Sequence, residues 1–122
     1  MSNQEIYDKV GDIGVLTTTF MCMSQADGNF SDEELQALFK LLHVFSNDPK
    51  DAIENTVSTI KDLSFAEKIQ FAFAGLKMFS EKTDSDTKGL IMQSLEIIAE
   101  SDGEVSSNEK AFYADVKKIL QA

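Results

Sequence analysis

The chain has 122 residues, of which 43% are hydrophobic and nine are Phe, and its formal net charge is −10. This length suits a single domain, residues 1–122, and the apolar content is sufficient for a core, which excludes a wholly disordered chain. The acidic balance disfavours binding to nucleic acid or anionic lipid and leaves cations and basic protein surfaces as natural partners, although charge also serves solubility alone.

Cysteine usage and the N-terminal segment indicate the compartment. Cys22 is the only cysteine, so no intramolecular disulfide can form, which fits a reducing environment. Residues 1–10 include Glu5 and Asp8 and lack the basic-then-apolar layout of a signal peptide. The longest uncharged stretch, residues 13–26, contains three Thr and suits a buried helix better than a membrane span. We therefore expect a cytoplasmic protein without direct membrane insertion.

Apolar residues recur at helical spacing along the whole chain, and no segment shows the strict alternation of a strand. The first helix is expected from Asn3 to Gln25. Its second half is apolar most of the way round, which predicts a central position. Gly11 and Gly14 either weaken this helix or let a neighbouring helix approach closely.

Capping residues delimit the later helices. These are expected to begin at Ser31, at Pro49 after the cap Asp48, at Ser64, after the polar run 81–86, and at Ser106. The second helix is expected to end near Ser46. The fold class is therefore all-α: a compact bundle of about six helices with two Asp-Gly capped loop-to-helix elements.

One motif, Asp-Gly-x-apolar-Ser-x-x-Glu, occurs twice between predicted helices, with its two copies 75 positions apart. The copies read Asp27-Gly28-Asn29-Phe30-Ser31-Asp32-Glu33-Glu34 and Asp102-Gly103-Glu104-Val105-Ser106-Ser107-Asn108-Glu109. Ser-x-x-Glu is a capping box, in which Ser and Glu satisfy backbone N–H groups at the start of a helix. A third box, Ser64-Phe65-Ala66-Glu67, lacks Asp-Gly, so capping does not explain the repeated Asp.

The Asp-Gly part of the motif suggests cation binding. In an EF-hand loop an acid, a Gly, an apolar residue and a Glu occupy the fifth, sixth, eighth and twelfth positions, and both copies keep this spacing. The first position would be Met23 or Ile98, and neither supplies the oxygen ligand that an EF-hand site requires there. Two interpretations remain: structural capping alone, or a weak site for calcium, magnesium or zinc. The candidate ligands of that site are Asp27, Glu34, Asp102 and Glu109.

Around these two loops, at residues 26–34 and 101–109, the chain resembles the TerB-like family, which is named for bacterial tellurite resistance. The likeness extends to helix number, loop placement and length. It implies an all-α fold with the two acidic loops near each other, and a divalent-metal role for Asp27, Glu34, Asp102 and Glu109. The second copy is less acidic, because Ser107 and Asn108 replace Asp32 and Glu33. Related domains occur in a membrane-anchored J-domain co-chaperone, and no chemical step is assigned to the family.

The remaining reactive side chains indicate packing rather than chemistry. Met21, Cys22 and Met23 carry sulfur donors, but consecutive residues on a helix point about 100° apart, so the three sulfurs cannot converge on one ion. His43 has no motif partner, and nucleophile elbows, phosphate loops and zinc spacings are absent from the sequence. We therefore expect no enzyme. The predicted function is a stress-response or tellurite-resistance-like binding domain with a divalent cation and an unidentified protein partner. The alternative is a pure protein-interaction module without metal.

Overall fold

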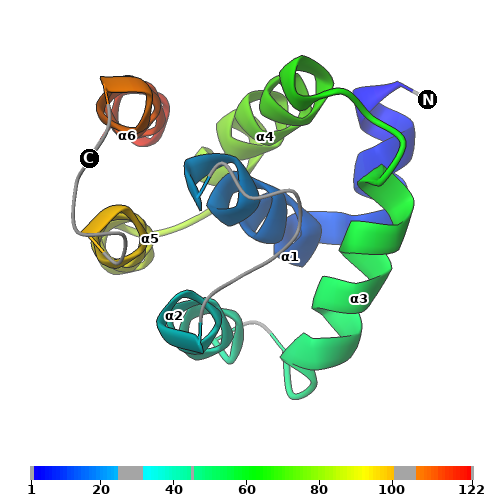
Figure 1. The fold of residues 1–122 in the computed structure, drawn as a ribbon, viewed down its shortest axis with the longest axis horizontal. Helices are drawn as coiled ribbons and strands as arrows, with labels where there is room; N and C mark the ends of the chain where they lie inside the picture. Colours follow the sequence, from blue (N-terminus) through cyan, green and yellow to red (C-terminus); the bar gives the residue numbers. More distant parts are fainter. Residues whose placement is uncertain (1, 25–31, 45, 101–106, 122) are drawn as a thin grey trace.

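A computed structural model describes residues 2–24, 32–44, 46–100 and 107–121, which form six α-helices and contain no strand. The helices are α1 (Asn3–Ser24), α2 (Asp32–Leu42), α3 (Pro49–Ile60), α4 (Phe65–Ser80), α5 (Ser85–Glu100) and α6 (Ser107–Leu120). In Figure 1, α1 runs through the middle of the molecule, and it packs against each of the other five helices. The all-α bundle and the central position of the first helix are thereby confirmed.

The second half of α1 is buried on every side. All residues from Val15 to Met23 are at most 3% exposed. This run includes three threonines, whose hydroxyls donate to the carbonyl oxygens one turn back, at 2.8 Å in each case. Because each hydroxyl is hydrogen-bonded within its own helix, its burial leaves no donor unsatisfied. This segment therefore forms the axis around which the other helices pack.

Gly11 divides α1 into two segments. Its backbone has φ 68° and ψ −167°, which interrupts the helical geometry. We name residues 3–10 the arm and residues 12–24 the central segment. Gly14 has a different role: a Cβ there would clash with the Val10 side chain and would lie 3.2 Å from Thr56 Oγ1, so the glycine makes room for Val10 and lets α3 approach. The two effects expected of these glycines are therefore both found: Gly11 interrupts the helix, and Gly14 allows a close approach.

The predicted caps of α3 and α4 are present. Asp48 accepts a hydrogen bond from the backbone N–H of Asp51 at 3.4 Å, and α3 begins at Pro49. At α4 the Glu67 N–H donates to Ser64 Oγ at 3.1 Å, and the Ser64 N–H donates to Glu67 Oε1 at 2.9 Å. These two bonds form a complete capping box, so local sequence rules locate both helix starts correctly.

Two helix boundaries differ from expectation. α5 begins at Ser85, inside the polar run, because Asp84 caps it by accepting from the Thr87 N–H at 2.8 Å. α2 ends at Leu42 rather than near Ser46, because the Val44 N–H bonds to the Leu41 carbonyl and tightens the last turn. The proposed caps Ser31 and Ser106 lie outside the described residues. No helix in the described ranges is both long and apolar enough to cross a membrane.

Candidate functional site

The structure describes only part of the predicted cation site. Asp27 and Asp102 lie outside the described residues, as does the side chain of Glu34, whose backbone belongs to α2. Glu109 lies in the first turn of α6 and is 6% exposed. Within the described ranges, no group of three or more His, Cys, Asp or Glu side chains could hold a metal ion. The four-residue site therefore remains a prediction.

Three of the four helix ends that border the two motif loops, those of α1, α5 and α6, meet at one pocket of about 410 Å³. Met23 stands at the end of α1, where the first loop begins, and Glu100 is the last residue of α5, where the second begins. The described residues lining this pocket, which we name the loop-end pocket, are Met23, Glu96, Ala99, Glu100, Lys110 and Tyr113. The start of the first loop and both edges of the second thus lie at the same end of the bundle.

A hydrogen bond joins α5 to α6 in the loop-end pocket. Tyr113 Oη donates to Glu96 Oε1 at 2.6 Å. This bond, with a smaller contribution from burial, raises the pKa of Tyr113 to about 12, so the phenol remains a neutral donor near neutral pH. Motif reasoning missed both residues. The only sequence signal is their helical spacing, with Tyr113 one turn after Glu109 and Glu96 one turn before Glu100.

A second and larger pocket, of about 580 Å³, lies between α1, α4 and α6. Its described lining is mostly apolar and consists of Cys22, Phe65, Ile69, Phe73, Asn108, Ala111, Phe112 and Asp115. We name it the α4–α6 pocket. The Phe73 and Phe112 rings are stacked there, with centroids 5.4 Å apart and planes inclined by 23°. Phe65, Ile69 and Phe73 recur every four residues and so form one apolar stripe, but helical spacing alone does not separate a core face from a pocket wall.

Cys22 contributes a neutral thiol to the α4–α6 pocket. Burial raises its pKa to about 12, and the nearby charge of Lys68 lowers it only in part. The thiol is therefore protonated at neutral pH and a poor nucleophile and metal ligand. Its neighbours Met21 and Met23 are 3% and 1% exposed, which confirms the predicted packing role of this tripeptide. His43, by contrast, is an exposed residue just beyond α2.

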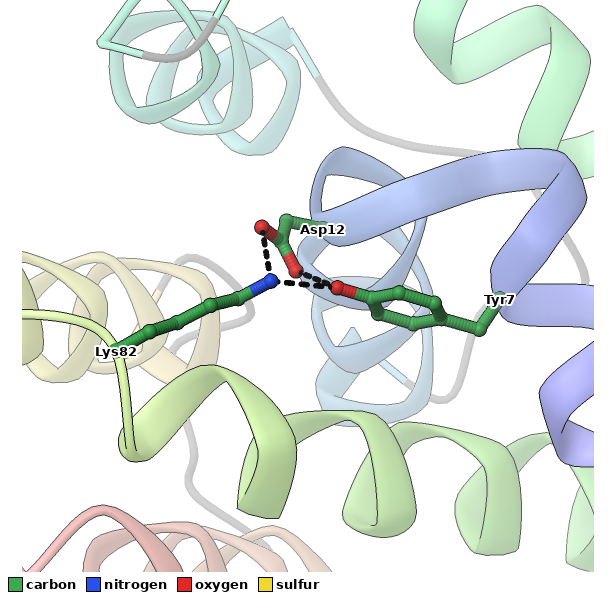
Figure 2. Close-up of polar contacts among 3 residues, drawn as sticks. All are labelled: Tyr7, Asp12 and Lys82. Carbon is green, nitrogen blue, oxygen red and sulfur yellow. Dashed lines mark hydrogen bonds and ion pairs between the residues drawn. The ribbon is translucent and has the colours of Figure 1, made fainter.

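A polar cluster ties the arm to the turn that follows α4 (Figure 2). Lys82 Nζ lies 2.8 Å from Tyr7 Oη and 3.0 Å from Asp12 Oδ2, while the Tyr7 hydroxyl donates to Asp12 Oδ1. The hydrogen bond to Tyr7 makes the largest contribution to raising the pKa of Lys82, and the hydrogen bond to Asp12 makes the next largest. All three side chains bind one another, so the arrangement is a structural tie between segments far apart in sequence.

Comparison with known proteins gives one match. The family model described as tellurite resistance protein TerB matches residues 15–122. Neither a curated protein nor a solved structure matches the chain. The matched range begins within the central segment of α1 and takes in the ends of that helix and of α5 that border the motif loops. Since it covers nearly the whole chain, the protein belongs to the TerB family of tellurite resistance proteins.

Proposed function

We propose that this domain acts by binding rather than by catalysis, and that a divalent cation at Asp27, Glu34, Asp102 and Glu109 modulates the binding. The observation that carries the proposal is the loop-end pocket, where residues near three of the four helix ends that border the motif loops come together. Separation by 75 residues in sequence does not separate the helix ends from which the loops depart. Two acidic loops that leave from one place are suited to share a cation.

The position of Glu109 supports the same proposal. Burying a carboxylate is unfavourable unless positive charge or hydrogen bonds stabilise it. The N-terminal end of α6 supplies part of that stabilisation through its N–H groups and dipole. The carboxylates of Glu96 and Glu100, which line the loop-end pocket, would attract a divalent cation, and Lys110 in the same pocket opposes that attraction in part. Oxygen ligands of this kind favour calcium or magnesium over softer metals.

A thermal melt of chelator-treated protein with and without calcium, magnesium, manganese or zinc tests this proposal. A cation at 1 mM that binds the folded state with a Kd of about 0.1 mM adds about 1.4 kcal/mol to the free energy of unfolding. We expect a selective rise of the melting temperature. The double variant Asp27→Asn and Asp102→Asn should remove that rise. An unchanged rise in the double variant would contradict the assigned ligands.

The capping box of α4 provides the matched control. Glu67 occupies the same box position as Glu109 but has no Asp-Gly before it, so it should not contribute to cation binding. Gln also serves at this position of a capping box. Glu67→Gln should therefore keep the full cation response, whereas Glu109→Gln should weaken it. If both variants weaken the response equally, the effect reflects helix capping and not a metal site.

The partner we propose is a basic protein surface, because a domain with a net charge of −10 attracts positive charge. In the cation-modulated case, a chelator should change the affinity for such a partner. In the alternative, a pure protein-interaction module, the complex should resist chelator and dissociate at high salt. No melting response to any cation, together with a chelator-resistant complex, would favour the alternative.

A further inference from the structure

The α4–α6 pocket has no part in the cation proposal, yet it has the properties of a ligand site. Its volume of about 580 Å³ lies inside the range of roughly 300–1,000 Å³ that is typical of pockets for small organic ligands. Most of its described lining is apolar or aromatic, and Asn108 and Asp115 supply polar groups. We propose that this pocket binds a small organic ammonium compound whose body is aromatic or aliphatic.

The apolar part of the pocket suits the body of such a ligand. The stacked rings of Phe73 and Phe112 and the protonated thiol of Cys22 present uncharged surface. Phe65, at the start of α4, is 50% exposed although it lines the pocket. Large apolar side chains are stabilised when their exposed area is removed from water. A bound apolar body would cover part of Phe65 and extend the aromatic surface that already exists.

The charge of the ligand follows from Asp115. This carboxylate is exposed and lines both this pocket and the adjoining one. In the part of the chain that the structure describes, no lysine lies within ion-pair distance of it. The net charge of −10 also raises the local concentration of cations. An ammonium group at the Asp115 rim meets both conditions.

Three lysines near the pocket restrict where that positive charge can lie. The charge of Lys68 acts on Cys22, while Lys77 and Lys118 line the adjoining pocket with Asp115. Lys68 disfavours positive charge on the Cys22 side of the pocket, whereas Lys77 and Lys118 limit the positive charge that Asp115 can attract to one. We therefore expect one ammonium group at Asp115 and an uncharged body that extends toward Phe73 and Phe112.

Three probes of equal shape test the proposal: tryptamine, the neutral alcohol tryptophol and the anion indole-3-propionate. Each is titrated into the full ¹⁵N-labelled chain in the presence of EDTA, with amide shifts as the readout. Tryptamine should bind about tenfold more tightly than tryptophol, and the anion more weakly than either. The largest shifts should fall on Ile69, Phe73, Ala111 and Asp115. Because EDTA removes divalent cations, the result is independent of the cation proposal.

Two variants and a control locate the site. Asp115→Asn should lower the affinity for tryptamine to about that for tryptophol, a loss of about tenfold, and leave tryptophol unchanged. Ala111→Phe, at an exposed position of the lining, should block all three probes while the spectrum outside the pocket stays that of the folded protein. Glu54→Gln removes one exposed charge on α3 and should change nothing.

The proposal fails if the three probes bind equally, if the anion binds most tightly, or if millimolar tryptamine shifts no pocket residue. It also fails if Glu54→Gln weakens tryptamine as much as Asp115→Asn does, since the effect would then be one of overall charge. If Asp115→Asn lowers the affinity for tryptamine and leaves the affinity for tryptophol unchanged, both the binding place and the charge class of the ligand are established.

Discussion

The two segments of α1 reach stability in different ways. The central segment is buried on all sides and meets its neighbours through apolar packing. Most residues of the arm, on the other side of Gly11, are exposed, with Ile6 as its single fully buried side chain. Polar contacts hold the arm: the Asn55 side-chain amide donates to the Lys9 carbonyl at 3.2 Å, and Tyr7 joins the Lys82 cluster. One continuous helix in the sequence is therefore two structural units.

This contrast coincides with the limits of the family match. The match to the TerB family begins at residue 15, one residue after the buried run of the central segment begins at Gly14. The arm, Gly11 and Asp12 lie outside it. The matched range thus includes the buried part of α1 but not the arm. Substitutions in the two segments should consequently lower the free energy of unfolding by different amounts.

The largest expected effect is in the centre of the core. Phe20→Ala should lower the free energy of unfolding by about 3–5 kcal/mol, because a fully buried ring is replaced by a cavity. Ile6→Ala should cost nearer about 2 kcal/mol, since Ile6 borders a surface pocket into which the structure can relax. Urea denaturation of both variants measures the difference. Equal costs would mean that the arm belongs to the core as fully as the central segment does.

The next effect concerns the approach of α4 to the central segment. A Cβ at Gly75 would lie 2.4 Å from Val15 Cγ2, and the side chain of Val is stiff. Gly75→Ala should therefore destabilise the protein by about 1–3 kcal/mol. Gly89 in α5 is the control, because a Cβ there meets nothing within 4 Å. Gly89→Ala should stabilise by about 0.5–1 kcal/mol. A harmless Gly75→Ala in thermal melts would show that the helices can separate without cost.

At the junction of the two segments, Gly11→Ala should cost about 1–3 kcal/mol. The combination of φ 68° and ψ −167° is one that residues with a Cβ adopt only under strain, although open space surrounds the position. The arm should lose its docking before the bundle unfolds. Hydrogen exchange should then rise in residues 3–10 and stay unchanged in the central segment. Uniform exchange throughout α1 would argue that the segments are not independent.

The smallest effect is at the surface tie. Asp12→Asn should cost about 0.2–1 kcal/mol, and less at high salt, because the Lys82 and Asp12 side chains are 51% and 30% exposed. The pKa of Lys82 is raised from its usual 10.5 on folding. Its contribution is therefore complete below pH 10.5 and is lost as the pH rises through the folded pKa. The variant should show a smaller alkaline decline in stability, because the hydrogen bond between Lys82 and Tyr7 remains; an identical pH profile would contradict the contribution of Asp12.

Local rules predicted much of the fold. The cap at Asp48, the Pro49 start and the Ser64–Glu67 box were predicted correctly because each depends on residues within one helical turn. The kink could not be derived in the same way. Gly11 was recognised as a weak point, but its positive φ depends on Ile6 and Tyr7 docking against distant parts of the chain.

The candidate sites were less predictable than the helices. The repeated motif identified the two loops, but the position of their bordering helix ends at one pocket follows from how α1, α5 and α6 pack. The bond between Tyr113 and Glu96 has the same origin. The α4–α6 pocket depends on the spacing between two helices, which no sequence period encodes. Both pockets and the bond between Tyr113 and Glu96 therefore depend on tertiary packing, which the sequence pattern does not specify.

The three consecutive threonines of α1 show why hydropathy underestimates the burial of a helix of this kind. Each hydroxyl is occupied by a carbonyl of its own helix, so the neighbours meet methyl groups and hydrogen-bonded oxygens. To its surroundings, the stretch from Thr17 to Thr19 resembles a run of valines, although a hydropathy scale counts it as polar. A profile based on residue type alone therefore understates how deeply this helix is embedded. Families that exchange Thr and Val at such positions would conserve the same packing surface.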